Sequence, residues 1–415
     1  MSERTGWWNI CRLVGSEIQP VAPMEAEFGA PKGLRPSSFD FFDAPGAPEA
    51  AAGSKLYCAY VQNGLANLGV AEEGEGHGGR LRRLDTPFSV IAGLRAGPAG
   101  VVFIGGASTE GPCVVRYRPE QGGSEILRRS TDVAVAPAYL SVPEAIEFPT
   151  EGGLTAHAFY YRPQNPDFVA PKGELPPLRV VCHGGPVGAT TAALNLRIQY
   201  WTSRGFAVLD VNYGGSIGYG RSYRRRLRGK WGVVDVDDCV TGVRYLVAKG
   251  EVDGNRTMIM GGSAGGYTTL AALAFRNVFR AGASHFGVSD LEVLAKETHK
   301  FESRYLDSLI GRYPEDIAIY HERSPLYHAD GFSCPVIFFQ GLEDKVVPPN
   351  QAELMVAKLR AKGIPVAYVP FAGEGHGFRR AENIKRALEA EFYFISRVFG
   401  FQPAEDLEPV PIENM

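Results

Sequence analysis

Apolar and polar residues follow two different patterns along this chain, and the change comes near residue 178. Before it, apolar runs are short and are separated by Gly, Pro or Asn, a pattern that predicts brief strands joined by turns. After it, longer apolar runs alternate with stretches such as 381–399, in which apolar residues recur at helical spacing. The pattern therefore predicts an all-β region followed by an α/β region.

Within the all-β region we expect strands at 56–61, 81–84, 101–104, 114–117 and 125–127. A weak internal repeat relates some of them, because 56–57 corresponds to 101–102 and 82–84 corresponds to 127–129. The repeat length of roughly 45 residues is that of a four-stranded propeller blade. Since two or three blades cannot close a ring, we expect residues 1–138 to form an incomplete, propeller-like region.

The α/β region is predicted to form one sheet. Its expected strands are the apolar runs at 178–182, 206–211, 257–260, 281–286, 336–339 and 366–370, with helices that include 234–248, 354–362 and 381–399. Apolar strands joined by helices indicate a mostly parallel, doubly wound sheet that is covered on both faces. We expect this α/β domain to span residues 139–403 and to be followed by a C-terminal tail at 404–415.

One predicted strand-to-helix junction carries a nucleophile motif, Gly261-x-Ser263-x-Gly265. Glycines beside a serine permit a sharp turn that projects the hydroxyl clear of the backbone, as nucleophilic attack requires. Ser216 stands in a second match to the same pattern, but a polar, basic segment follows it, whereas a stretch that can form a buried helix follows Ser263. We therefore favour Ser263 as the nucleophile and keep Ser216 as the alternative.

A serine nucleophile needs a base to take its proton and an acid to orient that base. Asp344 and His376 each follow a predicted strand, and His376 stands on a glycine-rich loop. Because the ligand sites of parallel sheets lie at the carboxyl ends of their strands, both side chains should gather near Ser263. The chain order Ser, Asp, His is that of α/β-hydrolases. Glu343, the neighbour of Asp344, stays open as the alternative acid.

An oxyanion would be stabilised by backbone N–H groups close to the nucleophile. Ala264 begins the helix after Ser263, so its N–H is one expected donor. The second donor is expected in the segment 183–186, His-Gly-Gly-Pro, whose glycines leave amides exposed after the first strand of the sheet. His183 itself is expected to be a structural, hydrogen-bonding residue and not a second base.

Composition narrows the range of functions. The formal net charge of −3 gives no reason to expect nucleic-acid or membrane binding. The six cysteines form no C-x-x-C pair, so we expect reduced core residues and neither a disulfide framework nor a zinc site. Since the chain begins without a secretory signal and contains no apolar run of about 18 residues, we expect a cytoplasmic protein. No metal or organic cofactor is implied.

Six segments together resemble the prolyl oligopeptidase family of serine peptidases, in particular its dipeptidyl aminopeptidase/acylaminoacyl-peptidase branch. They are His183–Pro186, Asp210–Gly220, Trp231–Gly232, Gly261–Tyr267, Gly341–Pro349 and Glu374–Phe378. The similarity covers about residues 140 to 400. It implies an α/β-hydrolase fold preceded by a propeller, which is shortened here, and peptidase activity on short peptides.

The resemblance also implies roles for individual residues. It assigns the catalytic triad to Ser263, Asp344 and His376. It assigns the oxyanion amides to Gly185 and Ala264. It assigns the lining of the pocket for the residue before the scissile bond to Tyr267 and the 286–291 segment, with Phe286 and Val288.

We therefore expect a serine-type peptidase that hydrolyses short peptides through an acyl-enzyme. Two alternatives stay open. One is a carboxylesterase-type hydrolase that uses the same triad on small esters. The other is an inactive, truncated homologue that is destabilised by unpaired blade edges. Short peptides are the expected partners, and exposed blade edges would allow a homo-oligomer.

Overall fold

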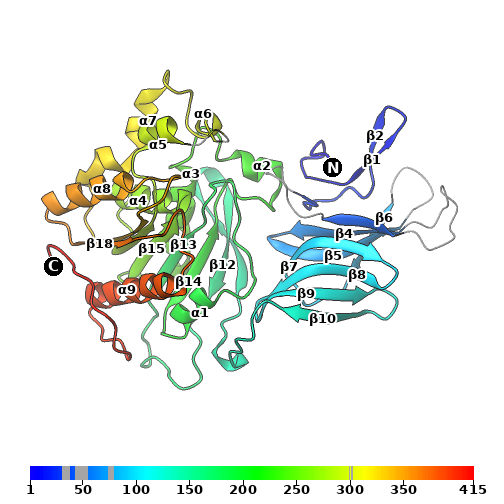
Figure 1. Cartoon of the computed structure of the whole chain (residues 1–415), viewed down its shortest axis with the longest axis horizontal. Helices are drawn as coiled ribbons and strands as arrows, with labels where there is room; N and C mark the ends of the chain where they lie inside the picture. The colour runs from blue at the N-terminus through cyan, green and yellow to red at the C-terminus, as the bar shows by residue number, and fades with distance from the viewer. Residues whose placement is uncertain (30–37, 43–54, 73–78, 299, 301) are drawn as a thin grey trace. The chain divides into compact units, whose positions relative to one another are not determined.

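A computed structural model describes residues 1–29, 38–42, 55–72, 79–298, 300 and 302–415 (Figure 1). The chain divides into two compact units. The first unit consists of Met1–Ala145, Ala189–Gln199 and Ser216–Arg225, and the second of Ile146–Gly188, Tyr200–Gly215 and Arg226–Met415. The first unit thus includes two segments from within the region of α/β periodicity. The domain boundaries expected at 138/139 and 403/404 stay predictions.

Antiparallel sheets make up the first unit. A hairpin pairs β1 (Cys11–Val14) with β2 (Glu17–Pro20). One sheet has the order β3 (Phe39–Phe42), β4 (Lys55–Gln62), β5 (Leu65–Glu72) and β6 (Arg80–Leu84). Another has the order β7 (Val90–Gly97), β8 (Gly100–Ala107), β9 (Glu110–Arg118) and β10 (Gly123–Arg129). The weak sequence repeat marks equivalent strands, because it relates β4 to β8 and β6 to β10.

Strand β4 of the first unit is buried on both faces. Tyr57 packs in a cluster with Phe103 of β8, which belongs to the other four-stranded sheet. The neighbouring Leu56 points the other way, into a cluster with Phe28 of the N-terminal segment. Side chains alternate between the two faces of a strand, so an almost continuous apolar run is what a doubly covered strand requires.

The second unit is built on a sheet with the order β11-β12-β14-β13-β15-β16-β17-β18. Strand β12 is antiparallel to β14, and the strands from β14 to β18 are parallel. The bounds are β11 (Glu144–Pro149), β12 (Thr155–Tyr161), β13 (Leu178–Cys182), β14 (Ala207–Asn212), β15 (Thr257–Gly262), β16 (Ala281–His285), β17 (Val336–Gly341) and β18 (Val366–Phe371). The predicted fold class, an all-β region before a mostly parallel α/β sheet, is confirmed.

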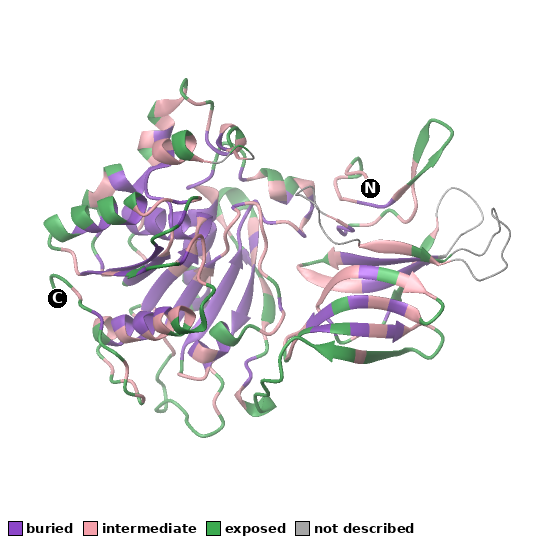
Figure 2. Ribbon diagram, viewed as in Figure 1, coloured by how far each residue is buried: buried purple, intermediate pink, exposed green. Residues whose placement is uncertain are grey.

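Helices cover both faces of this sheet. Along β13, Val180 packs in the cluster that contains residues of α3, α4 and α8, whereas Arg179 bonds to Glu391 of α9 from the other face. The α-helices are α1 (Leu196–Thr202), α2 (Gly220–Arg225), α3 (Val234–Ala248), α4 (Ala264–Phe275), α5 (Leu291–Glu297), α6 (Tyr305–Leu309), α7 (Ile317–Arg323), α8 (Asn350–Ala361) and α9 (Ala381–Phe399). Short 3-10 helices are η1 (Pro137–Tyr139), η2 (Glu151–Gly153) and η3 (Pro325–Gly331). Figure 2 shows the strands of this sheet as its most buried part.

The last residues of the chain return to this sheet. The N–H of Val366 in β18 donates to the carbonyl oxygen of Glu413 at 3.0 Å, and Arg360 of α8 pairs with the Glu413 side chain. The predicted tail at 404–415 is therefore held at its far end. Within the described residues, no helix combines the length and apolarity needed to cross a membrane.

Candidate active site

Ser263 stands at a sharp turn between β15 and α4. Its backbone has φ 57° and ψ −121°, a conformation that costs energy for any residue except glycine and that is characteristic of active sites. The flanking glycines are required by close approach of the backbone. A Cβ on Gly261 would lie 2.3 Å from the carbonyl oxygen of Gly265, and a Cβ on Gly265 would lie 2.1 Å from that of Cys182. The motif composition thus follows from the geometry of the turn.

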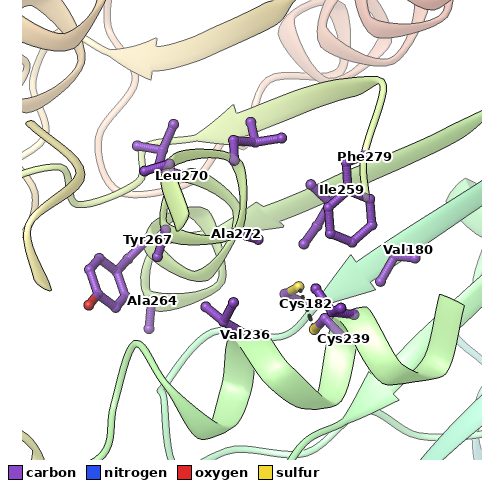
Figure 3. Close-up of a cluster of buried hydrophobic side chains, with 14 of the residues drawn as sticks. Val180, Cys182, Val236, Cys239, Ile259, Ala264, Tyr267, Leu270, Ala272 and Phe279 are labelled. Carbon is purple, nitrogen blue, oxygen red and sulfur yellow. Dashed lines mark hydrogen bonds between the residues drawn. The ribbon is translucent and has the colours of Figure 1, made fainter. Parts of the chain in front are cut away.

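The helix behind Ser263 is fixed by packing. Figure 3 shows Tyr267, Leu270 and Ala272 of α4 in one buried cluster, with Val236 and Cys239 of α3 below them. All residues from Ala264 to Ala274 are buried. A helix that is apolar on every side fits only inside a protein, which is what the small-residue run after the serine indicates.

The structure brings the three predicted triad residues together. Nε2 of His376, on the loop after β18, lies 2.9 Å from Oγ of Ser263. Nδ1 of the same ring lies 2.8 Å from Oδ2 of Asp344, on the loop after β17. With the imidazole proton on Nδ1, the ring donates to Asp344 and accepts from the serine hydroxyl, as a general base must.

Asp344 fits the acid position better than its neighbour Glu343. It is 4% exposed, and its Oδ1 accepts the N–H groups of Val346 at 2.8 Å and Val347 at 2.9 Å. These two bonds orient the carboxylate so that Oδ2 faces His376. Glu343 is exposed to solvent. Geometry therefore favours Asp344.

The alternative nucleophile, Ser216, does not belong to the same unit as the predicted triad. Ser216 belongs to the first unit and is fully buried, whereas Ser263, Asp344 and His376 all belong to the second unit. A nucleophile must reach its substrate, so the buried Ser216 does not meet that requirement.

Glu374 holds the loop between β18 and α9 that carries His376, which we call the histidine loop. The sequence did not predict this role. Its carboxylate accepts the N–H groups of Arg379 and Arg380, each at 3.0 Å, and the side-chain amide of Asn383 at 2.8 Å. The bond from Asn383, together with those from the backbone, lowers the pKa of Glu374 despite desolvation. The signal in the sequence was a lone carboxylate two positions before the histidine.

The predicted oxyanion residues lie beside the nucleophile. Gly185 and Ala264 line the same pocket as Ser263. Gly185 has φ 134°, a region that only glycine enters easily, and a Cβ on Gly184 would lie 3.6 Å from Cβ of Ser263. The loop after β13 therefore brings backbone, and not side chains, next to the serine.

His183 is held inside this loop. Its ring stacks on Tyr213 with centroids 4.2 Å apart. The Tyr213 hydroxyl lies 3.0 Å from the carbonyl oxygen of His183 and 2.9 Å from that of Pro186, so it can donate to either. Burial lowers the pKa of His183 to about 4, which keeps the ring neutral at neutral pH. This matches the expectation of a structural residue.

The pocket at Ser263 has a mostly apolar lining and a cavity of about 40 Å³. Its lining residues are Gly185, Pro186, Trp231, Ser263, Ala264, Val288, Leu294, Thr298, Glu302, Tyr305, Leu306, Val346 and Val347. Val288, one of the expected lining residues, is among them. Trp231 is recognisable in the sequence as part of the Trp-Gly segment, but its place in the pocket was not predicted.

The other two expected lining residues are not among the described residues that line the pocket. Tyr267 is fully buried, its ring contacts that of Trp231 with centroids 4.5 Å apart, and its hydroxyl donates to the carbonyl oxygen of Arg323 at 3.0 Å. Gly232 leaves room for it, since a Cβ there would lie 2.0 Å from the Tyr267 hydroxyl. Phe286 instead packs against the ring of His376, 4.9 Å between centroids. In the part of the chain that the structure describes, no three His, Cys, Asp or Glu side chains are grouped as a metal ion requires.

Comparison with known proteins gives the context of this site. The model of the prolyl oligopeptidase family matches residues 192–402. The chain is 34% identical over 236 residues to dipeptidyl aminopeptidase BIII of Pseudoxanthomonas mexicana, a match that covers 55% of this chain and 34% of that relative. It is 31% identical over 222 residues to the acylamino-acid-releasing enzyme of Arabidopsis thaliana, covering 51% and 29%. The chain thus spans about a third of the length of these curated relatives.

Solved structures extend the similarity to nearly the whole chain. A puromycin-hydrolyzing peptidase of Mycobacterium tuberculosis is 44% identical with a TM-score of 0.89, and the match covers 99% of this chain and 61% of that one. A puromycin hydrolase mutant complexed with PGG is 38% identical with a TM-score of 0.88 and the same coverage. Both the all-β and the α/β units therefore have counterparts in solved peptidases.

Proposed function

Because the chain belongs to the prolyl oligopeptidase family, we propose that it is a serine peptidase that hydrolyses peptide bonds in short peptides through an acyl-enzyme. The observation that carries the proposal is the chain of two hydrogen bonds from Ser263 through His376 to Asp344, 2.9 Å and 2.8 Å long. Such a chain activates a hydroxyl that would otherwise be a weak nucleophile.

In the first half of the reaction, Ser263 Oγ attacks the carbonyl carbon of the scissile bond while its proton moves to Nε2 of His376. Asp344 stabilises the imidazolium that forms and keeps its ring oriented. The N–H groups of Gly185 and Ala264 are proposed to stabilise the oxyanion of the tetrahedral intermediate. His376 then gives the proton to the leaving amine, and an ester to Ser263 remains.

In the second half, water attacks this ester and His376 takes a proton from the water. The second tetrahedral intermediate collapses, the acid product leaves and the proton returns to Ser263 Oγ. Every proton transfer passes through Nε2 of one ring, so the placement of that ring determines both halves of the reaction.

The apolar pocket supports a preference for an apolar residue before the scissile bond. Trp231, Val288 and Val347 offer contacts to a hydrocarbon or aromatic side chain, whose transfer from water is favourable. Relatives named for hydrolysis of puromycin and for release of acylamino acids support the same general chemistry. We therefore propose short peptides or aminoacyl amides with an apolar residue at this position as substrates.

Labelling with a fluorophosphonate tests the nucleophile. We expect Ser263→Ala to abolish covalent labelling of the purified chain and Ser216→Ala, the matched control, to retain it. A folded wild-type sample that takes up no label would contradict the proposal. Turnover of a panel of aminoacyl anilides, compared with that of p-nitrophenyl acetate, then separates a peptidase from an esterase, since only the peptidase cleaves the anilides efficiently.

A further inference from the structure

A buried ionic cluster, which we call the Arg179 cluster, lies on the face of the sheet covered by α9. It consists of Arg179 in β13, Glu391 in α9 and His285 at the end of β16. The Arg179 guanidinium donates to Oε1 of Glu391 from Nε at 3.0 Å and from Nη2 at 2.9 Å. The other oxygen, Oε2, lies 3.1 Å from Nε2 of His285. The Glu391 carboxylate thus connects the start of β13 with the end of β16, two strands further along the sheet.

All three side chains of the cluster are largely removed from water. Side-chain exposure is 5% for Arg179, 2% for Glu391 and 12% for His285. Burial alone would raise the pKa of Glu391, but the charge of Arg179 and the bonds from His285 and Arg179 outweigh it, and the pKa is lowered. Buried ion pairs are poor sources of net stability, so their presence is better explained by the geometry that they fix.

His285 connects this cluster to the nucleophile. Its carbonyl oxygen accepts the N–H of Ser263 at 3.0 Å. Its ring stacks on Phe339 of β17 with centroids 4.4 Å apart. The ring is therefore fixed by a bond at one nitrogen and by an aromatic face, and the backbone of the same residue supports the turn that carries the nucleophile.

The next residue, Phe286, connects the cluster to the base. It has φ 40°, which is strained for a residue with a large side chain. Its N–H donates to the carbonyl oxygen of Phe339 at 2.7 Å, and its ring contacts those of His376 and Phe378, at 4.9 Å and 5.5 Å between centroids. The end of β16 thus touches both groups between which the proton moves.

Little free space separates this strand end from the nucleophile turn. A Cβ on Gly262 would lie 3.0 Å from the Phe286 ring, and a Cβ on Gly266 would lie 2.6 Å from Cα of Gly287. Because these surfaces are in contact, a displacement of the end of β16 must displace the turn or the ring of His376.

We propose that the Arg179 cluster positions the catalytic base: by holding His285 at the end of β16, it fixes the Phe286 ring against His376 and the Ser263 amide against the His285 carbonyl. The inference rests on the proposed function, since it concerns the same site. His285 and Glu391 are positioning residues and contact no substrate. A misplacement of about 1 Å between reacting groups can cost on the order of 10²-fold in rate, so a small shift here would be measurable.

The test uses His285→Phe, which keeps an aromatic ring for Phe339 but removes the bond to Glu391. We expect kcat to fall about 10- to 100-fold with KM changed less than about twofold, because the proton transfer and not the pocket is disturbed. The matched control is His321→Phe. His321 is also bonded to a glutamate, Glu292 at 2.7 Å, but its side chain is 43% exposed and its ring packs against Tyr327 of η3, with centroids 4.7 Å apart. We expect both of its constants to stay within about twofold of wild type.

Two further measurements separate positioning from general destabilisation. The low-field proton resonance of the His376 Nδ1–H bonded to Asp344 should shift or broaden in His285→Phe and remain in His321→Phe. His285→Gln, whose amide can donate to Glu391 from the position of Nε2, should recover most of the lost kcat. If His285→Phe does not fold, Glu391→Gln takes its place, with the same expectations for kcat and for the resonance.

Wild-type kcat in His285→Phe would overturn the inference. A loss of kcat with an unchanged His376 resonance and no recovery in His285→Gln would also overturn it, because lowered stability alone would then explain the loss. A wild-type chain that takes up no fluorophosphonate would instead reject the proposed function, so the two failures are distinguishable.

Discussion

The two units use strands of similar length in different ways. In the second unit, every residue of β14 and of β17 is buried, because helices cover both faces of a parallel sheet. In the first unit, β9 alternates between buried and exposed positions, and β10 is exposed along nearly its whole length. Figure 2 shows this contrast within each unit. A side chain at the end of a strand enclosed on both faces has fewer ways to move, which is what a catalytic arrangement requires.

The predicted catalytic residues follow that rule. Ser263, Asp344 and His376 each come directly or shortly after a parallel strand that is wholly or mostly buried, β15, β17 and β18 respectively. Their loops are short and are held by further bonds, such as those of the Asp344 carboxylate to Val346 and Val347. The contrast between the units therefore predicts where substitutions affect the reaction and where they affect only stability.

The largest effect is expected at Asp344 in the second unit, the carboxylate that we propose orients His376. Asp344→Asn should lower turnover of an aminoacyl anilide by roughly 10⁴-fold, because an amide cannot hold the imidazole in the required tautomer. The control is Glu343→Gln, whose side chain is exposed and which should stay within about twofold of wild type. A loss of less than about tenfold in Asp344→Asn, with a large loss in Glu343→Gln, would move the acid to Glu343.

Core truncations test whether the two units depend on each other. Phe103 in β8 and Phe338 in β17 are each 1% exposed, so Phe→Ala at either should cost about 3–5 kcal/mol. We expect Phe338→Ala to lower the urea concentration at which fluorophosphonate labelling is lost, since it destabilises the unit that carries Ser263. Phe103→Ala should destabilise the first unit and leave that concentration nearly unchanged. Equal shifts in both variants would instead show that the two units unfold together, and would contradict their independence.

Protonation of a buried carboxylate gives the third effect. Asp235 of α3 is fully buried, accepts the N–H of Gly232 at 2.7 Å and the hydroxyl of Thr268 at 2.6 Å, and burial raises its pKa to about 6 from an ordinary 3.8. Between these pH values the folded chain keeps a proton that the unfolded chain releases, so stability falls as pH rises. Above pH 6 the cost is complete, about 3 kcal/mol.

Asp235→Asn removes this titration. Its stability relative to wild type should therefore increase by about 2.5 kcal/mol between pH 4 and pH 7, measured by urea unfolding at each pH. Asn can still accept from Gly232 through its oxygen, which limits the loss of bonding. A difference between variant and wild type that stays constant over this range would contradict the shifted pKa.

Much of the second unit could be predicted from the sequence because its patterns are strong. The helix expected at 381–399 has those bounds, and the strand, turn and helix around Ser263 were recognisable from glycines that the backbone geometry requires. In the first unit, β1, β2, β3, β5 and β7 were not predicted, and in β5 and β7 glycines interrupt the apolar alternation. A local pattern therefore predicts an element only where the residues of that element keep an uninterrupted period.

Features that depend on distant partners could not be predicted in this way. Arg179 stands inside an apolar run and reads as an interruption, because its partner Glu391 lies 212 residues further along the chain. Tyr267 was expected in the pocket but instead packs against Trp231, in a position that only a glycine at residue 232 leaves open. The segments 189–199 and 216–225 carry no signal that would assign them to the first unit.

The smallest effect is expected for an ion pair at the exposed edge of the sheet β10-β9-β8-β7 in the first unit. Arg129 of β10 and Glu110 of β9 lie 3.2 Å apart, with side-chain exposures of 53% and 30%. Water screens such a pair, and ordering two long side chains costs entropy, so Arg129→Ala should change the free energy of unfolding by less than about 1 kcal/mol. The same chemistry in the Arg179 cluster is enclosed, and Arg179→Ala would leave Glu391 as a buried charge, so its cost should be several times larger. Urea unfolding of the two variants measures the ratio. Equal costs would mean that enclosure by helices on both faces does not distinguish the units, and enclosure could then no longer explain why the predicted catalytic residues stand at the ends of the buried strands.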